Sequence, residues 1–363
     1  MSRHAFFLTV DCGYLPLARG LGQRLAGQWD CDVHVFLEDP RADEANGGSR
    51  GRVCVHVNKV AGLRPEGLPV TRNWPAIVYD RIFAPRFLTG YDRLTYLDAD
   101  IFPLTAAPEA LAVPLRHGLG AVQDTASVGF SPHGAGLTRD AWRASIGLRS
   151  ERYFNSGMLM IDPVLWIQID FAGALDRFVA AHGQAVRMPD QDFLNWQFQD
   201  RWTEFSPRFN FQKGLFNYGY EAWFPPAFLH FSSFQKPWLG PDCADSVQGQ
   251  FHEPFLEMVR RAGCDADLLT RRIRASWPRR LRKAVRKALS SAGLPVGKER
   301  RLRAEWHKRA HPLYDGFVED LRTGRYADMP LTGFQATEMP RPTLTFDGQY
   351  LRRRLTLEAE SLT

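Results

Sequence analysis

The chain has 363 residues, of which 44% are hydrophobic and 24% charged. This length and composition exclude a disordered tail and a small module that depends on disulfides or metal ions for stability. Its 46 basic and 40 acidic residues give a formal charge of +6, and residues 271–287 hold nine of the basic residues and no acidic one. The rest of the chain therefore carries a net charge of −3. A nucleic-acid-binding fold usually spreads positive charge over its main body, so the distribution indicates a basic appendage on a near-neutral domain.

Short β-rich runs alternate with stretches that suit helices. We predict strands at 5–10, 33–37, 53–57, 94–97 and 118–122, with further runs at 157–161 and 228–231. We predict helices at 15–27 and 190–198. This alternation is typical of an α/β fold with a mostly parallel sheet that is covered by helices on both faces.

The composition changes after about residue 245, where the strand pattern ends and arginine becomes frequent. We therefore predict a catalytic domain over residues 1–245 and a basic, mainly helical region over 246–312. For the C-terminal extension, residues 313–363, no fold is assigned.

The five cysteines are odd in number and lack CxxC or histidine-coupled metal spacing, which argues against a secreted disulfide scaffold and a zinc module. No apolar run approaches the roughly 18 residues that span a bilayer, and the first run meets Asp11 too early for a signal peptide. We expect a soluble cytoplasmic protein, peripheral at most on the inner face of the cytoplasmic membrane.

The strongest local signal is the run from Arg93 to Phe102, in which a hydrophobic strand ends in Asp98-Ala-Asp100. Open α/β sheets bind ligands at the carboxyl ends of their strands, and Mg²⁺ or Mn²⁺ prefers such oxygen ligands together with substrate phosphates. Two other interpretations stay open. In the first, the two aspartates simply lie in a solvated turn after the strand. In the second, they are the catalytic pair of a phosphatase, although Phe102 stands where a phosphatase has Thr or Val.

With this motif the chain resembles the retaining glycosyltransferases of family 8, and the resemblance covers roughly residues 5–240. The matching motifs follow the family's order: Val78-Tyr-Asp-Arg81, Tyr96-Leu-Asp98-Ala-Asp100, Tyr153-Phe-Asn155-Ser-Gly157, Pro189-Asp190-Gln191-Asp192, Arg208-Phe-Asn210 and His230-Phe-Ser-Ser-Phe-Gln-Lys236-Pro237-Trp238. The resemblance implies a GT-A fold, which is a Rossmann-like α/β fold, and a UDP-sugar donor.

The resemblance also implies ligands for the metal and the nucleotide. Mn²⁺ (or Mg²⁺) would be held by Asp98, Asp100 and His230, with Lys236 and Arg81 near the phosphates. Asp11 and Tyr14 would contact the uracil. Taken singly, these residues have ordinary alternatives: a core histidine, a solvated lysine, a surface ion pair, a helix N-cap and a packing tyrosine.

Around the donor sugar, the resemblance places Asp124, Asn155, Asp190, Gln191 and Asp192, and the last three are the candidate catalytic residues. Asp190 would alternatively be a helix N-cap with Asp192 in the first turn. Gln191 lacks the charge of a covalent nucleophile, so the residues give little support to double displacement. The chain departs from the family at Gly13, where Asn is frequent, and at Ser233, where a Gly approaches the phosphates.

The basic segment predicts an amphipathic helix that starts at Pro278 and ends before Gly293. One side carries Trp277, Leu281, Ala284, Val285, Ala288, Leu289 and Ala292; the other carries Arg279, Arg280, Arg282, Lys283, Arg286 and Lys287. Two interpretations stay open: a helix that docks on an anionic membrane surface, and a helix packed on the catalytic domain with a solvated basic face.

The preferred hypothesis is a retaining glycosyltransferase that moves a hexose from UDP-galactose or UDP-glucose to a glycan or glycolipid acceptor, in bacterial surface polysaccharide synthesis. One alternative is a Mg²⁺-dependent phosphohydrolase that uses Asp98 and Asp100. The other is a catalytically decayed protein that binds sugar nucleotides or glycans.

Overall fold

The computed structural model describes residues 3–42, 48–125, 139–216, 219–232, 236–239, 247–269 and 313–329, with scattered positions between 277 and 292. Its main element is an eight-stranded sheet in the order β3-β4-β2-β1-β5-β8-β7-β9. The strands are β1 (His4–Asp11), β2 (Asp32–Glu38), β3 (Gly48–Arg50), β4 (Val53–Val57), β5 (Arg93–Leu97), β7 (Leu119–Gln123), β8 (Phe154–Ile161) and β9 (Thr203–Phe205). Four of the seven strand pairs are parallel, so the predicted fold class is confirmed.

A smaller sheet of three strands lies beside the first, in the order β10-β11-β6. Its strands are β6 (Ile101–Pro103), β10 (Phe211–Gln212) and β11 (Phe228–His230). The predicted strand at 228–231 therefore does not extend the main sheet. The chain leaves that sheet at Asp98 and pairs β6 antiparallel with β11, which sets His230 opposite Ile101.

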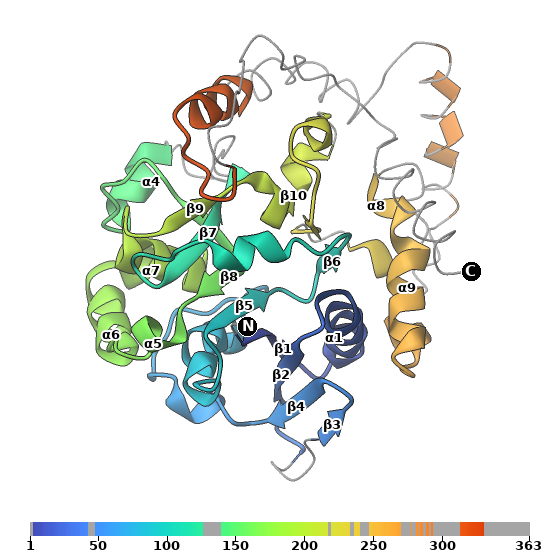
Figure 1. The fold of residues 1–363 in the computed structure, drawn as a ribbon, viewed down its shortest axis with the longest axis horizontal. Coiled ribbons are helices and arrows are strands. Elements are labelled where there is room, and N and C mark those ends of the chain that lie inside the picture. Colours follow the sequence, from blue (N-terminus) through green and yellow to red (C-terminus); the bar gives the residue numbers. More distant parts are fainter. Residues whose placement is uncertain are drawn as a thin grey trace.

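Helices cover both faces of the main sheet, as Figure 1 shows. On one face α1 (Leu15–Trp29) lies next to α9 (His252–Arg261); on the other are α5 (Pro163–Trp166), α6 (Phe171–His182) and α7 (Pro189–Phe198). Strand β1 serves both layers, because Phe6 and Leu8 belong to one buried cluster and Ala5 and Phe7 to the other. The shorter helices are α2 (Asp80–Phe83), α4 (Arg139–Ser145) and α8 (Val247–Gln250).

Helix α9 and the helix at 313–322 share one hydrophobic core with residues 1–245. Phe255 and Val259 of α9 are buried, and Gly20 of α1 lies so near that a Cβ there would be 2.9 Å from the Met258 carbonyl oxygen. In the second helix, Phe317 packs edge-on against Tyr220. The change of composition near residue 245 thus does not interrupt the packing, since apolar side chains on both sides of it fill one core.

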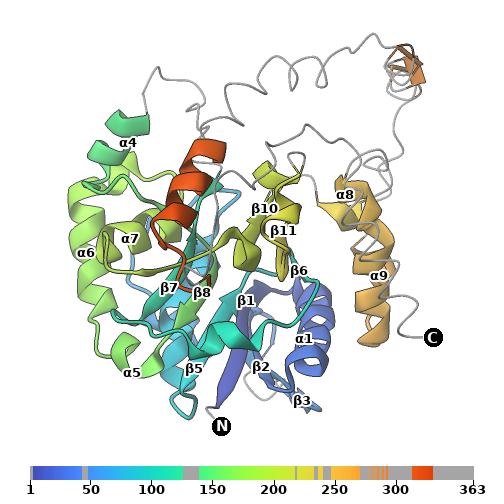
Figure 2. The same ribbon diagram turned by 45° about the horizontal axis from the view of Figure 1, so that its top comes forward.

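The segment after the helix at 313–322, red in Figure 2, covers the edge strand β9, which is labelled in Figure 1. The Ala327 amide donates to the Glu204 carbonyl at 2.9 Å, and Asp328 accepts from the Ser206 amide and hydroxyl at 2.7 and 2.6 Å. Such cover occupies backbone groups that an edge strand would otherwise leave free.

Within the basic segment, the described apolar positions are exposed, apart from the half-buried Leu289. Trp277 is 74% exposed, and Leu281 and Val285 are each 49% exposed. Arg279, Arg280, Lys283, Arg286 and Lys287 lie outside the described residues. In the part of the chain that the structure describes, no helix has the length and apolar character needed to cross a membrane.

Candidate functional site

Three metal-type side chains meet where β5, β6 and β11 come together, and we call Asp98, Asp100 and His230 the carboxylate–histidine cluster. Their ligand atoms all lie within 4.8 Å of one another. The His230 Nε2 atom is 3.3 Å from Asp100 Oδ1 and 3.8 Å from Asp98 Oδ2. The aspartates come from one strand end, whereas His230 arrives through the pairing of β11 with β6.

Asn210 fixes the orientation of the His230 ring. It belongs to the Arg208-Phe-Asn210 motif, but no role for it is predicted from the sequence. The Asn210 Oδ1 atom lies 2.8 Å from His230 Nδ1. A side-chain amide oxygen can only accept, so Nδ1 carries the proton and the lone pair of Nε2 faces the carboxylates. This is the usual arrangement behind a metal-binding histidine.

The cluster fits a hard divalent cation. Asp100 Oδ1 is buried and lacks a hydrogen-bond donor, which is costly unless another charged partner is present. Burial alone would raise the pKa of Asp100, but the neighbouring Lys236 ammonium holds it well below its ordinary range. Two carboxylates and one imidazole are a donor set that suits Mn²⁺ or Mg²⁺, and all three predicted metal ligands are together.

Lys236 closes one side of the cluster. Its ammonium group pairs with Asp100 Oδ2 and donates to the Phe231 carbonyl at 3.0 Å. Burial disfavours the charged amine, yet the neighbouring Asp100 carboxylate leaves the pKa of Lys236 above its ordinary value. A cation is thus held against the carboxylate–histidine cluster.

Gly157, in the first half of β8, lies directly against the cluster. A Cβ at this position would lie 2.8 Å from Asp98 Oδ2 and would also collide with the His230 ring. The Gly157 carbonyl also accepts from the Asp98 amide at 2.8 Å. The absence of a side chain at 157 therefore leaves room for the cluster.

Arg81 connects the cluster with Asp190. Its guanidinium lies 3.1 Å from Asp98 Oδ1 and 3.2 Å from Asp190 Oδ2, and it stacks over the Tyr96 ring at 4.4 Å. Burial raises the pKa of Asp190, and Arg81 and the Ser156 hydroxyl act against that rise. Arg81 is buried, so the carboxylates of Asp98 and Asp190 balance its charge in place of water.

A chain of side-chain amides extends from His230 to the remaining sugar-site candidates. Asn210 Nδ2 donates to Asn155 Oδ1 at 2.9 Å, and Asn155 Nδ2 donates to Gln191 Oε1 at 3.2 Å. Gln191 Nε2 then donates to Asp124 Oδ2 at 2.8 Å. These predicted residues are therefore linked to the carboxylate–histidine cluster by an unbroken network.

Asp192 is held by a separate set of donors. Its oxygens accept from the Tyr153 hydroxyl at 2.6 Å and from the amides of Arg187 and Met188 at 2.8 and 3.0 Å. Burial raises its pKa to about 7 in spite of these donors. Helix α7 begins at Pro189 after the N-cap Met188, so Asp190 is not the N-cap, and Asp192 is the residue that ties down the helix start.

Asp11 and Tyr14 lie beside the cluster at the end of β1. The Asp11 carboxylate accepts from the Tyr14 amide at 3.1 Å, and the Tyr14 ring, 38% exposed, meets Trp238 edge-on. Burial raises the pKa of the Tyr14 hydroxyl, with Lys236 acting in the opposite direction. Ser233, the other predicted donor contact, lies outside the described residues.

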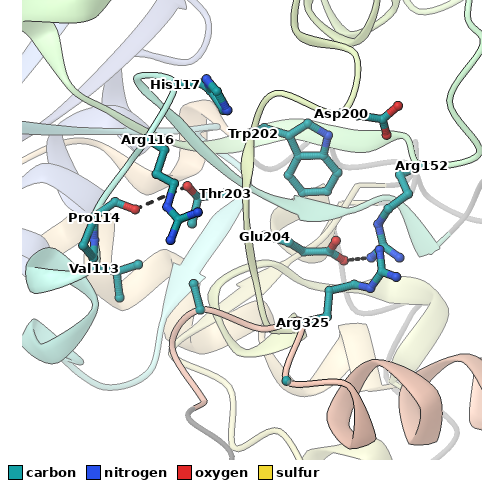
Figure 3. A pocket seen from close by; sticks show the side chains of 12 residues that line it. Val113, Pro114, Arg116, His117, Arg152, Asp200, Trp202, Thr203, Glu204 and Arg325 are labelled. Atoms are coloured by element: carbon teal, nitrogen blue, oxygen red, sulfur yellow. Dashed lines mark hydrogen bonds and ion pairs between the residues drawn. The ribbon is translucent and has the colours of Figure 1, made fainter.

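A cavity of about 650 Å³ lies elsewhere, along edge strand β9, and Figure 3 shows Trp202 and the paired Arg152 and Glu204 at its wall. Arg325, which follows the helix at 313–322, also lines the cavity. Its guanidinium pairs with the Asp320 carboxylate at 3.0 Å. None of the lining residues that the structure describes belongs to the carboxylate–histidine cluster. The chemistry described above is thus at the strand ends and not in this cavity.

The fold and the cluster define an α/β protein of the GT-A glycosyltransferase class. In structure the chain is similar to the galactosyltransferase LgtC, solved with donor and acceptor sugar analogs, with a TM-score of 0.56, 20% identity and coverage of 71% of this chain and 95% of that one. Residues 49–241 match the glycosyl transferase family 8 profile, and the chain belongs to that family.

Curated relatives include the glycosyltransferase GlyF of Streptococcus pneumoniae, 27% identical over 65% of this chain and 57% of GlyF. The lipopolysaccharide glucosyltransferase WaaO of Escherichia coli is 25% identical over 51% of this chain and 55% of WaaO. The chain thus spans little more than half the length of these two relatives.

Proposed function

We propose that this protein is a retaining glycosyltransferase that moves a hexose from UDP-galactose or UDP-glucose to a glycan or glycolipid acceptor. The observation that carries the proposal is the convergence of Asp98, Asp100 and His230 beside Lys236 in a member of family 8. The similarity to WaaO supports a role in bacterial surface polysaccharide synthesis. We assign the donor site to residues 1–245.

Asp98, Asp100 and His230 would hold Mn²⁺ or Mg²⁺, which when bound supplies positive charge against the departing diphosphate. Lys236 adds a fixed cation, and its pairing with Asp100 keeps it in position before the donor arrives. Arg81 has a different role, because it already pairs with Asp98 and Asp190 and orients both carboxylates. The stabilisation of the leaving group is therefore electrostatic.

Around the sugar, the network from Asn155 through Gln191 to Asp124 offers amides and a carboxylate that can exchange their mutual hydrogen bonds for sugar hydroxyls. Asp190 is paired with Arg81 and Ser156, and Gln191 is uncharged. This arrangement gives little support to a covalent glycosyl-enzyme, and we expect front-face transfer with retention. An NMR spectrum of the first-formed product should show the donor's anomeric configuration; the inverted anomer would refute retention.

A donor screen tests the proposal. Purified protein is incubated with each UDP-sugar and Mn²⁺, and UDP release is followed with and without acceptor. We expect release from one hexose donor well above the others, and its loss on chelation. Absence of UDP release from every donor, in the presence of tight UDP binding, would instead favour the decayed binding protein.

The phosphohydrolase alternative has weaker support. The first aspartate of such an enzyme attacks phosphorus, but Asp98 Oδ1 accepts from the Tyr96 hydroxyl at 2.6 Å and is paired with Arg81. A carboxylate oxygen held by two donors is a poor nucleophile. Release of inorganic phosphate from UDP-sugars or phosphate esters would support this alternative.

For the basic segment we propose docking on anionic membrane, where a lipid-linked acceptor would lie. The exposure of Trp277, Leu281 and Val285 supports this interpretation over a packed helix. Basic residues on the opposite side would add around 1 kcal/mol each near the surface. Binding to the inner face of the cytoplasmic membrane would follow.

Liposome sedimentation tests the docking. Binding should require anionic lipid, weaken with salt and fall when Arg279, Arg280, Arg282 and Lys283 are replaced by Glu, while activity on soluble acceptor persists. Substitution of four exposed basic residues outside the segment, Lys59, Arg72, Arg86 and Arg149, by Glu provides a charge-matched control. Indifference of the wild type to anionic vesicles at low salt would contradict the docking.

A further inference from the structure

A second group of ligand-type side chains lies on the face of the main sheet, on β2 and β4, and we call His34, Cys54 and His56 the histidine–cysteine cluster. Strand register sets His34 opposite Cys54 and Phe36 opposite His56. Since alternate residues of a strand share a face, the three side chains point the same way, and their ligand atoms lie within 4.8 Å of one another. Cys54 is a free cysteine.

The protons of this cluster can be assigned from its outer partners. Tyr91 donates its hydroxyl proton to Asp32 Oδ2 at 2.8 Å, so the Tyr91 oxygen accepts from His34 Nε2, also at 2.8 Å. His34 Nδ1 is then unprotonated, and it faces His56 Nε2 at 2.9 Å. A histidine that is oriented through its second nitrogen by a carboxylate relay has the arrangement found behind metal ligands.

We propose that the histidine–cysteine cluster binds Zn²⁺ through His34 Nδ1, His56 Nε2 and Cys54 Sγ, with water as a fourth ligand. Tetrahedral zinc separates two nitrogen ligands by about 3.3 Å, so the two rings must part by a few tenths of an ångström. On binding, the Cys54 thiol proton leaves to solvent and the His56 proton moves from Nε2 to Nδ1. The metal replaces the hydrogen bond between the rings.

The donor set separates this ion from the one at the carboxylate–histidine cluster. A thiolate and two imidazoles suit Zn²⁺, whereas two carboxylates and one imidazole suit Mn²⁺ or Mg²⁺. All three side chains are half-buried, which leaves a path for the ion, and Phe36 stacks on His56 with ring centroids 4.7 Å apart. The ion would tie β4 to β2 on the side of the sheet away from α1.

Cobalt spectroscopy on the full chain tests the proposal. Co²⁺ substitutes for Zn²⁺, and a thiolate ligand gives it a charge-transfer band in the near ultraviolet. The carboxylate–histidine cluster contains no sulfur, so the band reports on Cys54 without interference from it. We expect protein stripped by chelator to develop the band with one equivalent of Co²⁺ and to lose it when one equivalent of Zn²⁺ is added.

Three variants complete the test, each checked for folding by circular dichroism. Cys54→Ser should abolish the band, and Cys264→Ser, the matched change at another half-buried free cysteine, should retain it. Tyr91→Phe should keep the band but weaken Co²⁺ affinity about 10- to 100-fold, since it breaks the relay to Asp32. A wild-type chain without the band at micromolar Co²⁺, or a Cys54→Ser chain that retains it, would overturn the proposal.

Discussion

The carboxylate–histidine cluster lies where the main sheet and the smaller sheet meet, whereas the histidine–cysteine cluster lies on the main sheet, and the two are built in different ways. The first lies where β5 ends and the chain turns into β6, flanked by the cations Arg81 and Lys236. The second lies along the faces of two paired strands, and its nearest carboxylate, Asp32, reaches it through Tyr91.

The difference shows what each position in a sheet can support. At strand ends the backbone diverges, so a large anionic substrate has space, and the flanking cations balance its charge. On a strand face the pleat fixes the side chains about 5 Å apart, which suits a single small ion. The first position therefore suits chemistry on a ligand, and the second suits structural binding.

The largest effect expected is loss of a carboxylate from the first cluster. Asp98→Asn or Asp100→Asn should lower Mn²⁺-dependent UDP release by about 10³-fold, or about 4 kcal/mol of leaving-group stabilisation. Asp140→Asn, at an exposed aspartate of α4, is the control. Near wild-type release by both variants at saturating donor would mean that the cluster is not the metal site.

Filling the space beside the cluster should have the next largest effect. Gly157→Ala places a methyl group against Asp98 and His230, and a displacement near 1 Å is expected to reduce turnover by about 10²-fold. Gly27→Ala, where no atom lies within 4 Å of the added Cβ, should leave turnover unchanged. Steady-state UDP release measures both, and equal activities would contradict the close fit.

A smaller effect is expected from the residue that orients His230. Asn210→Ala removes the acceptor of the Nδ1 proton and should raise the Mn²⁺ concentration for half-maximal activity about 10- to 100-fold, with kcat at saturating Mn²⁺ little changed. Asn210→Asp keeps an acceptor and should restore much of the metal affinity, and Asn73→Ala is the exposed control. A fall in kcat alone would show that Asn210 does not act through the metal.

The smallest effect concerns His4, a buried histidine of β1 in the main sheet that belongs to neither cluster. Burial, aided by Arg93, lowers its pKa to about 3, and its Nε2 lies 3.0 Å from Thr95 Oγ1. The ring is neutral in the folded chain, whereas in the unfolded chain it gains a proton below about pH 6.5. Stability is therefore present above that pH and is lost as the pH falls toward 3.

At pH 5.5 the loss due to His4 should be about 1.4 kcal/mol relative to neutral pH. Urea unfolding at the two pH values measures it. His4→Gln should remove this part of the pH dependence, and His117→Gln, an exposed histidine, should not. An unchanged dependence in His4→Gln would show that His4 is not buried in the neutral form.

Much of the framework follows from local patterns. The strand predicted at 53–57 coincides with β4, and the helix predicted from 15 coincides with the start of α1. The Asp98-Ala-Asp100 pair was found at a strand end because a hydrophobic run followed by acidic residues is itself a local signal. Period-two alternation depends on the pleat of one strand, so a single segment of sequence carries it.

The partners of these elements depended on the tertiary structure. The run at 228–231 has the same composition as a strand of the main sheet, yet it pairs with β6, and that register puts His230 at the carboxylates. Similarly, His34 and Cys54 are 20 residues apart and become neighbours through the pairing of β2 with β4. Asp192, predicted beside the sugar, is held in the structure by the Tyr153 hydroxyl and two backbone amides, which come from the residue before β8 and from the segment before α7.

The amino-acid sequence by itself thus determined several strands of the main sheet, the helices α1 and α7 and the chemical types of the site residues. Each of these depends on a few successive positions and on the backbone periods of 2 and 3.6 residues. The tertiary structure decided which of those residues share a site, because strand register and helix packing are set by contacts between segments far apart in the chain. Asp98 and His230 are separated by 132 residues, and one antiparallel pairing brings them within 4 Å.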